Sequence, residues 1–518
     1  MEFISVLNDV LGPVMRGPSS SHTAGSYHIG RLVRSLLGDE PARAAFTFDP
    51  AGSYARTYRQ QGVDLALTAG LLGWPITDRR FSRALAAAPR SGFRPRFRVA
   101  PIAGADHPNT VVIDVLSKGR ERLLVTARSV GGGMIVVSEV DGWPVDLDGK
   151  SHAVLAWTTA NRARIVEKLL LDDAPSSGKP GRTRRDGTVL LTFRSRKPLA
   201  PEAASRLAAL DGVLKVRTAA PLFFIQKGAP LFLTGKQMVS LARRRGWSLG
   251  RTALEYESRL LGLSPAEVLA EIERRYGIMK DSVDRGLGGR GLRMQLLAPS
   301  AGQVLRAEAG KKLAAGGLHA RAAARAMAAL HVSNSMGIVC AAPTGGSAGV
   351  LPGVAVTLAE EKALDGEKTA LALLAASAVG LLVARRATFA AEVAGCQVEI
   401  GVAGAMAAAA VVEAAGGSAA QAADAAAVAL QNTMGSVCDL VQGICEIPCH
   451  TRNAAAAASA FVCADLVLGG YRNPIPLDET IDASYASGRM LPAELRCTAL
   501  GGIAAAPSGR SLRRRNWR

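Results

Sequence analysis

The chain has 518 residues, of which 48% are hydrophobic, enough for two or three domains with large cores. Its seven cysteines are an odd number, and its first residues show neither a basic start nor an apolar signal core, so we expect a reducing, cytoplasmic environment and no secreted disulfide scaffold. The longest apolar stretch, residues 370–384, is about 15 residues long, whereas a membrane span needs roughly 20, which favours a buried helix.

The net charge of +19 is compatible with a nucleic-acid partner. Part of this charge lies in residues 179–185 and in the tail, residues 510–518, which we expect to be unstructured. Only 5% of residues are aromatic, which leaves few side chains on which bases could stack. We therefore expect a basic, soluble enzyme with neither nucleic acid nor a membrane as its main partner.

Residues 1–170 are predicted to form an α+β domain. Helices are expected at residues 22–37, where the apolar side chains recur on one side, and at residues 64–72. The expected strands are rich in β-branched or aromatic residues and are bounded by Gly, Pro or Asp; they are residues 44–48, 97–100, 110–116, 123–127 and 134–140.

Residues 171–187 have the composition of a linker. A small unit, residues 188–233, is expected to follow, with a strand at 188–193, a helix at 201–210 and a strand at 214–224. This βαβ-like unit resembles a degenerate ACT-like module, a small regulatory domain that binds ligands.

Residues 234–506 are predicted to form a large all-α domain, because alanine, the strongest helix former, dominates between glycine breaks. The expected helices are residues 254–275, 319–330, 366–383, 403–415, 419–431 and 453–468. Several are apolar nearly all round, which places them inside a bundle. Residues 507–518 are expected to be a basic, disordered tail. The predicted fold is thus multidomain, with α+β, βαβ-like and all-α parts.

Two segments rich in hydroxyl groups are candidates for binding an anion such as a carboxylate. The first is Gly17-Pro18-Ser19-Ser20-Ser21-His22-Thr23-Ala24-Gly25, whose hydroxyls and N–H groups meet at a helix start. A plain helix cap is the alternative. The second, Thr344-Gly345-Gly346-Ser347, can cradle a carboxylate with backbone N–H groups, or it is a tight turn between helices.

Three cysteines, Cys396, Cys438 and Cys449, lie next to small or turn-forming residues. A cubane iron–sulfur cluster normally takes four cysteines, so a set of three leaves one iron open to a hydroxyl or carboxylate oxygen. The alternative is core packing, because free cysteine is often buried and the short zinc and ferredoxin spacings are absent. Core packing is the expected role of the remaining four, Cys340, Cys445, Cys463 and Cys497.

Further motifs connect these segments to a known family. Residues 17–25 are followed by motifs at 52–57, 107–110 and 129–133, and together they resemble the β part of bacterial iron–sulfur L-serine dehydratases. The α part of these enzymes is similar to residues 235–505, with its motifs, in matching order, at 341–349, 395–399, 438–439, 448–453 and 498–502. The chain therefore looks like a fusion of β and α parts, with the resemblance covering residues 1–155 and 235–505.

The resemblance implies a 4Fe–4S cluster held by Cys396, Cys438 and Cys449. The open iron would act as a Lewis acid on the hydroxyl of L-serine while a base takes the α-proton, and the released aminoacrylate would hydrolyse to pyruvate and ammonia. The residues implied to bind the substrate are Ser19, Ser20, Ser21, Thr23, Asn109, Thr344, Gly345, Gly346, Ser347, Arg452 and Asn453. Arg452 and Asn453 could instead donate hydrogen bonds to the cluster.

The chain departs from the family at Gln61. The family pattern is Lys-Gly-His-Gly-Thr-Asp, and residues 59–64 here read Arg-Gln-Gln-Gly-Val-Asp. Glutamine cannot take up a proton near neutral pH, so His22 and His107 remain as candidate bases, unless they are structural. Three functions stay open: an L-serine ammonia-lyase, a lyase for another hydroxy or thiol amino acid, and a catalytically impaired relative that binds an amino acid. We expect a homodimer.

Overall fold

The computed structural model describes residues 3–173 and 180–515. The chain divides into two compact units, one made of Met1–Ala24 together with Gly228–Arg518, and the other of Gly25–Lys227. The prediction of a mixed α/β region followed by a helical region is confirmed. The domain boundary is different from the predicted one at the N-terminus, because the first 24 residues belong to the helical unit.

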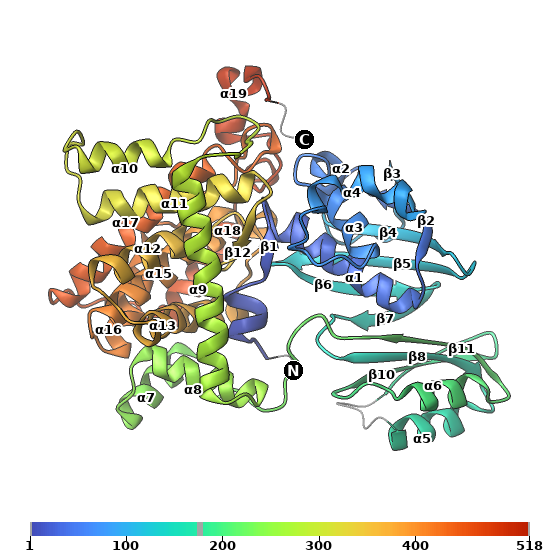
Figure 1. Cartoon of the computed structure of the whole chain (residues 1–518). Helices are drawn as coiled ribbons and strands as arrows, with labels where there is room; N and C mark the ends of the chain where they lie inside the picture. Colours follow the sequence, from blue (N-terminus) through green and yellow to red (C-terminus); the bar gives the residue numbers. More distant parts are fainter. Residues whose placement is uncertain (1–2, 174–179, 516–518) are drawn as a thin grey trace. The chain divides into compact units, whose positions relative to one another are not determined.

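The unit Gly25–Lys227 contains a six-stranded sheet with the order β3-β2-β4-β5-β6-β7 (Figure 1). Its strands are β2 (Pro41–Phe48), β3 (Arg94–Val99), β4 (Thr110–Ser117), β5 (Arg122–Gly131), β6 (Met134–Val140) and β7 (Trp143–Leu147). Helices α1 (Gly25–Leu37) and α3 (Val63–Leu71) share their apolar core with this sheet. Five of the strands and both helices were predicted; β7 was not.

The same unit contains a four-stranded antiparallel sheet with the order β11-β8-β10-β9. Its elements in chain order are β8 (His152–Thr159), α5 (Ala163–Asp173), β9 (Gly181–Arg185), β10 (Thr188–Ser195), α6 (Pro201–Ala208) and β11 (Val213–Ala219). This βαββαβ order is the ferredoxin-like arrangement. The prediction found only the second half of it.

The prediction of a linker at 171–187 is therefore wrong for its described residues, because they include the end of α5 and all of β9. Residues 174–179 lie outside the described residues. Strand β9 reads Gly-Arg-Thr-Arg-Arg and has no apolar alternation. It lies at the edge of the sheet and is mostly exposed, and charged residues on an edge strand oppose pairing with other chains. The charged residues at 181–185, which predicted an unstructured segment, instead protect an edge strand.

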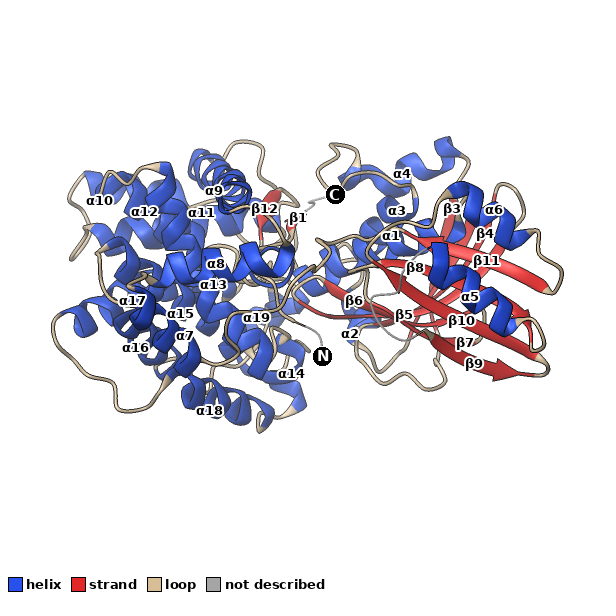
Figure 2. Ribbon diagram, turned by 90° about the horizontal axis from the view of Figure 1, so that it is seen from below, coloured by secondary structure: helices blue, strands red, loops and turns tan. Residues whose placement is uncertain are grey.

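The other unit is almost entirely helical (Figure 2). Its longer helices are α7 (Gly235–Arg245), α8 (Leu249–Leu261), α9 (Pro265–Gly288), α10 (Ala301–Ala309), α11 (Leu318–Asn334), α12 (Val350–Glu361), α13 (Gly366–Arg386), α15 (Ile400–Ala414), α16 (Ala419–Gln431), α17 (Cys449–Leu468) and α18 (Leu477–Arg489). Small side chains, mostly alanine, fill the core between α13, α15, α16 and α17. The predicted helical domain is confirmed, although α7, α10, α12 and α18 were missed.

One predicted helix, residues 254–275, is wrong because the chain breaks within it. Gly262 ends α8 in the left-handed conformation, with a φ of 63°. Ser264 then starts α9 with a capping box, in which its side chain and that of Glu267 each accept a hydrogen bond from the other's backbone N–H group. Pro265 occupies the first turn, where its missing N–H costs nothing.

Two helices, Gly366–Arg386 and Cys396–Ala414, are long and apolar enough to cross a membrane. Of the most apolar 18 residues of each helix, 78% and 89% are buried inside the described structure. Core helices of large helical domains pass the same length and composition test. The prediction of a buried helix at 370–384 is confirmed by α13.

The N-terminal segment is tied into the helical unit at two places. Strand β1 (Val14–Arg16) pairs antiparallel with β12 (Ile338–Cys340), and the Ala341 N–H donates to the Pro13 carbonyl at 3.1 Å. On α8, the buried carboxylate of Glu257 accepts hydrogen bonds from the Ser5 hydroxyl and from the backbone N–H groups of Val6 and Leu7, the last two at 2.8 and 2.9 Å. These contacts fix the chain that leads into residues 17–25.

Replacing Glu257 with glutamine is expected to loosen this anchor. The amide keeps one acceptor oxygen, but its –NH2 group would face a backbone N–H group, which can only donate, and this costs about 2 to 3 kcal/mol. Amide exchange at residues 6 and 7 should then be roughly 30 to 150 times faster. Glu255→Gln on the same helix, which removes a surface ion pair with Arg251, is the control and should leave this exchange unchanged. Equal exchange in both variants would contradict the anchor.

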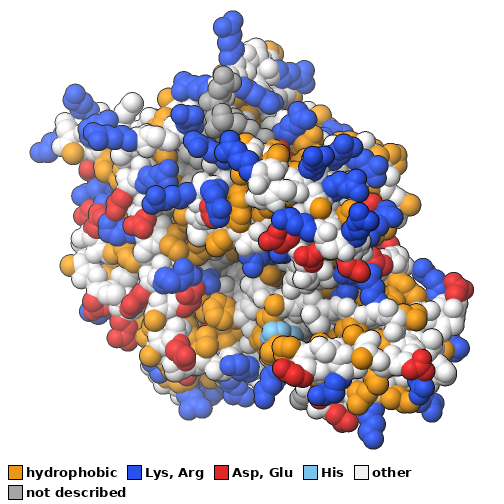
Figure 3. All heavy atoms as spheres, turned by 45° about the vertical axis from the view of Figure 1, so that its right-hand side comes forward, with side chains coloured by type: hydrophobic (Ala, Val, Ile, Leu, Met, Phe, Trp, Pro, Cys, Tyr) orange, Lys and Arg blue, Asp and Glu red, His pale blue; other side chains and the backbone are white. Residues whose placement is uncertain are grey.

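On the face that Figure 3 shows, Lys and Arg side chains are spread widely, with Asp and Glu between them. The predicted disordered tail is wrong for residues 507–515: α19 (Pro507–Ser511) is helical, Arg514 Nε donates to Gln442 Oε1 at 2.7 Å, and the Arg515 N–H donates to the Gln295 carbonyl at 2.7 Å. Residues 516–518 lie outside the described residues.

Candidate active site

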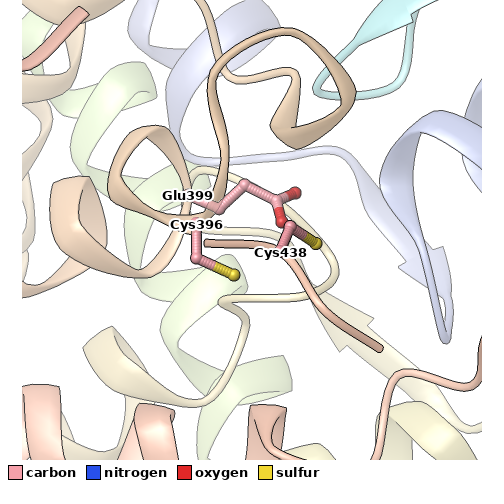
Figure 4. A group of neighbouring side chains, drawn as sticks. All are labelled: Cys396, Glu399 and Cys438. Atoms are coloured by element: carbon pink, nitrogen blue, oxygen red, sulfur yellow. The ribbon is translucent and has the colours of Figure 1, made fainter. Parts of the chain in front are cut away.

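Two of the three predicted cysteine ligands meet beside a carboxylate. The Sγ atoms of Cys396 and Cys438 and a carboxylate oxygen of Glu399 all lie within 4.8 Å of one another, and Figure 4 shows the three side chains next to one another. Cys396 begins a single 3-10 turn, Cys396–Val398, just before α15. That turn returns Glu399, three residues later, to the side of Cys396. Glu399 was not predicted as a site residue, although this spacing was a usable signal.

The third predicted ligand, Cys449, is the first residue of α17. The Cys445 Sγ lies 3.7 Å from the Cys449 Sγ. Cys445 is buried, as core packing predicts, but its thiol lies next to that of Cys449. We call Cys396, Cys438, Cys445 and Cys449 the cysteine cluster.

Cys497 joins the cluster from the C-terminal part of the chain. The Cys438 N–H donates to the Leu495 carbonyl and the Cys497 N–H to the Cys438 carbonyl, both at 2.8 Å, and the two thiols are hydrogen-bonded. Core packing alone is therefore an incomplete description of Cys497. Cys340 and Cys463 remain consistent with core roles: Cys340 is hydrogen-bonded to a backbone carbonyl, and Cys463 to Ser459 and Asn432.

Charge around Cys396 favours its thiolate. The hydrogen bond from the Cys438 thiol lowers the pKa of Cys396, and the guanidinium of Arg452 lowers it further. The same hydrogen bond raises the pKa of Cys438 well above its ordinary value. Arg452 Nη1 lies 3.7 Å from Cys396 Sγ, 2.7 Å from the Val437 carbonyl and 2.9 Å from Asp439 Oδ1. Of the two predicted roles for Arg452, this geometry favours a hydrogen bond to the cysteine sulfur, here that of Cys396.

The pKa of the Glu399 carboxyl group is shifted in the opposite direction to that of Cys396. Burial raises its pKa well above the ordinary value, and the negative charges of Cys396 and Glu392 act in the same direction. The Thr344 hydroxyl is hydrogen-bonded to it. Glu399 therefore links the cysteine cluster to the glycine-rich loop.

The glycine-rich loop, Thr344–Ser347, is held by its own hydroxyls. Thr344 Oγ1 and Ser347 Oγ are 2.9 Å apart, and each accepts a hydrogen bond from the other residue's backbone N–H at 3.2 Å. A Cβ atom at Gly346 would lie 3.4 Å from Glu399 and 3.5 Å from Cys445 Sγ. The loop thus passes directly beside the cysteine cluster.

The hydroxyl-rich N-terminal loop contacts the other side of the glycine-rich loop. A Cβ atom at Gly345 would lie 2.8 Å from the Ser20 nitrogen and 3.0 Å from the Ser19 carbonyl carbon, so only glycine allows this approach. Ser20–Ala24 form a π-helical turn that leads into α1, and all five residues are buried. His22 Nδ1 lies 3.0 Å from Ser21 Oγ and 3.3 Å from Ser19 Oγ.

Asn453 connects the glycine-rich loop to α17. Its Nδ2 donates to the carbonyls of Gly346 and Cys449, both at 2.9 Å, and its Oδ1 accepts from the Gly349 N–H at 3.2 Å. These three bonds to backbone use both N–H groups of the amide. The side chain predicted to bind the substrate therefore holds the loop against Cys449.

Three predicted site residues, Gln61, His107 and Asn109, belong to the other unit, Gly25–Lys227. Gln61 is buried and precedes Gly62, which starts α3 with a φ of 66°. The Asn109 N–H donates to His107 Nδ1 at 3.1 Å, and Asn109 is buried. Their catalytic and binding roles stay predictions.

Known proteins match both parts of the chain. The family described as serine dehydratase alpha chain matches residues 233–504. The probable L-serine dehydratase alpha chain of Bacillus subtilis is 35% identical over 285 residues, which are 55% of this chain and 95% of the relative. The L-serine dehydratase alpha chain of Peptoniphilus asaccharolyticus is 32% identical over 283 residues, 54% of this chain and 97% of the relative.

A beta chain matches as well. The probable L-serine dehydratase beta chain of Bacillus subtilis is 43% identical over 178 residues, which are 33% of this chain and 79% of the relative. The alpha-chain match covers more than half of the polypeptide, and it coincides with the helical part that carries the cysteine cluster and the glycine-rich loop. The chain therefore belongs to the bacterial L-serine dehydratases, a family of lyases, and joins beta-like and alpha-like parts in one polypeptide.

Proposed function

We propose that this chain is an iron–sulfur-dependent L-serine ammonia-lyase that converts L-serine to pyruvate and ammonia. The observation that carries the proposal is the meeting of Cys396, Cys438 and the Thr344–Ser347 loop at Glu399. Thiols that converge in this way are the soft ligands that iron–sulfur clusters take. The loop beside them supplies hydroxyls and backbone N–H groups for a small, charged substrate.

The donor set fits a 4Fe–4S cluster held by Cys396, Cys438 and Cys449. All three thiols are buried, and the hydrogen bond from Cys438 and the guanidinium of Arg452 lower the pKa of Cys396, which favours a thiolate there. When bound, a cluster with three cysteine ligands supplies a Lewis-acidic iron that weakens the bond between the β-carbon and the hydroxyl of serine.

The chain's own residues bind and orient the amino acid. We assign the substrate carboxylate to the N–H groups and hydroxyls of Ser19–Ser21, Thr23 and the Thr344–Ser347 loop, which touch one another at Gly345. Asn453 keeps the second of these loops against the start of α17. Both loops therefore have a fixed position relative to Cys449, as an ordered elimination requires.

A base must remove the α-proton, and we assign this step to Nε2 of His22. The Ser19 and Ser21 hydroxyls orient the imidazole through Nδ1, on the loop that we assign to the carboxylate. A base held there would lie close to the α-carbon next to that carboxylate. The aminoacrylate that leaves after loss of water hydrolyses to pyruvate and ammonia without help from the protein.

Gln61 supports a second candidate, a catalytically impaired relative that binds an amino acid without turning it over. The amide at this position cannot exchange a proton near neutral pH, where the family pattern has histidine. The ferredoxin-like arrangement of β8–β11 extends the predicted ACT-like resemblance, which would suit a role in sensing an amino acid.

One assay separates the two candidates. Protein reconstituted anaerobically with iron and sulfide is given L-serine, L-threonine or L-cysteine, and the keto acid that forms is measured, alone and in the Gln61→His variant. An active lyase is expected to form pyruvate from L-serine, with a higher rate in Gln61→His if the histidine contributes a proton transfer. Cluster-loaded parent and variant that both bind L-serine without forming pyruvate would contradict the lyase and support the impaired relative.

A further inference from the structure

The segment after α18 crosses the loop that carries Cys438. We call residues 495–503 the C-terminal strap. The Leu495 carbonyl accepts a hydrogen bond from the Cys438 N–H, and the Cys497 N–H donates one to the Cys438 carbonyl, both at 2.8 Å. Residues 438 and 496 form a parallel β-bridge. The strap contains Thr498-Ala499-Leu500-Gly501-Gly502, a motif of the family resemblance for which the proposed reaction has no role.

The strap also holds the side chain that follows Cys438. Asp439 Oδ2 accepts from the Ile503 N–H at 2.8 Å, and Gly502 packs against the same side chain. A Cβ atom at Gly502 would lie 2.6 Å from the Asp439 Cβ, and the φ of Gly502 is 59°, so a side chain there would both strain the backbone and displace Asp439. The second carboxylate oxygen, Oδ1, accepts from Arg452 at 2.9 Å.

These contacts form one continuous path from the strap to a metal-binding sulfur. Ile503 fixes Asp439, Asp439 fixes Arg452, and Arg452 Nη1 lies 3.7 Å from Cys396 Sγ. The Asp439 side chain is only 5% exposed, in contrast to a typical surface ion pair that solvent screens. The Val437 carbonyl, 2.7 Å from the same Nη1, completes the set of acceptors that hold the guanidinium.

We infer that Asp439, held by the C-terminal strap, is a positioning residue that directs Arg452 onto the sulfur of Cys396 and thereby tunes the iron site. The inference rests on the proposed iron–sulfur function and names a determinant of its reactivity. A hydrogen bond to a thiolate ligand withdraws electron density from the iron, which raises its reduction potential and makes it a stronger Lewis acid. The strap acts on the reaction through this hydrogen bond, without contact with the substrate.

The test uses variants that leave every charge in place, because neutralising Asp439 or Arg452 would itself change the potential. Gly502→Ala displaces Asp439, and Arg452→Lys keeps the positive charge but loses the planar guanidinium that spans the Cys396 sulfur and the Asp439 carboxylate. Gly416→Ala is the control for the first, since Gly416 has a φ of 77° and open space around its Cβ position. Arg386→Lys, on the Arg386–Asp482 surface pair, is the control for the second.

Iron and sulfide content, reduction potential and steady-state kinetics are measured on the reconstituted full chain. In Gly502→Ala and Arg452→Lys we expect a lower potential than in the parent and a kcat lower by about 10- to 100-fold. The controls should keep the parent's potential and kcat. A merely structural role would change protein yield and the unfolding midpoint but leave the potential of the loaded fraction unchanged.

The outcomes separate this inference from the proposed function. Parent protein that takes up no iron would overturn the proposed function, and the inference with it. A loaded parent whose potential equals that of both loaded variants would overturn the inference alone. Variants that load poorly are compared through the potential of their loaded fraction, so poor loading does not obscure the result.

Discussion

Cys438→Ser is expected to remove both the cluster and the activity. A serine hydroxyl is a hard, weakly acidic ligand that replaces a soft thiolate, so the iron should not be retained. We expect the charge-transfer absorbance of the reconstituted protein to be lost and the rate of pyruvate formation to fall at least about 1,000-fold, because the Lewis acid supplies several kcal/mol of the barrier reduction. Absorbance, iron content and rate are measured on the same sample.

Cys463→Ser is the matched control. Cys463 is a buried cysteine on α17, the helix that Cys449 begins, and its sulfur is hydrogen-bonded to Ser459 and Asn432 instead of to another thiol. This variant should keep its iron and its activity. A full-strength spectrum in Cys438→Ser would remove Cys438 from the ligand set, and equal losses in both variants would mean that any buried serine on this side of the core disrupts the fold.

Gly345→Ala is expected to reduce the activity strongly. The added Cβ would meet backbone atoms of Ser19 and Ser20 at 3.0 and 2.8 Å, and backbone cannot move aside as a flexible side chain can. The two loops assigned to the substrate must then separate, and a misplacement of about 1 Å can cost roughly 100-fold in rate. We expect kcat/KM for L-serine to fall about 100-fold with the iron content unchanged.

The control for this substitution is Gly404→Ala in α15. A Cβ there would lie 3.6 Å from the Ala456 Cβ, which is ordinary van der Waals contact, and alanine is the better helix former. Gly404→Ala should retain the parent's kcat/KM. Parent-like kinetics in Gly345→Ala would show that contact between the two loops is not required for the reaction.

The sequence predicted the fold well where composition was distinctive and failed where charge or a short break concealed an element. The five strands from β2 to β6 were found because they are rich in β-branched or aromatic residues, and the helices of the alanine-rich part because alanine dominates there. The break between α8 and α9 was missed although Gly262, Ser264 and Pro265 carry its signals. Strand β9 had no sequence signal for a strand, because exposed arginines occupy most of its positions at the edge of the sheet.

For the candidate site, the sequence identified the pieces but not all of their neighbours. Cys396 and Cys438 converge as the resemblance implied, and Glu399 could have been inferred from its position three residues after Cys396. The proximity of Cys497 to Cys438 could not have been inferred from the sequence, because it results from a parallel bridge between residues far apart in the chain. Asn453 was predicted to bind the substrate because a sequence does not reveal that its amide donates hydrogen bonds to backbone carbonyls.

The central claim, a cluster with three cysteine ligands and an iron that binds the substrate, is tested most directly by the Mössbauer spectrum of protein reconstituted with iron-57, recorded before and after addition of L-serine. The account predicts a 4Fe–4S spectrum in which one iron site changes its isomer shift and quadrupole splitting when L-serine is added, while the other sites stay the same. A protein without a cluster spectrum, or a cluster whose iron sites are all unaffected by saturating L-serine, would contradict it.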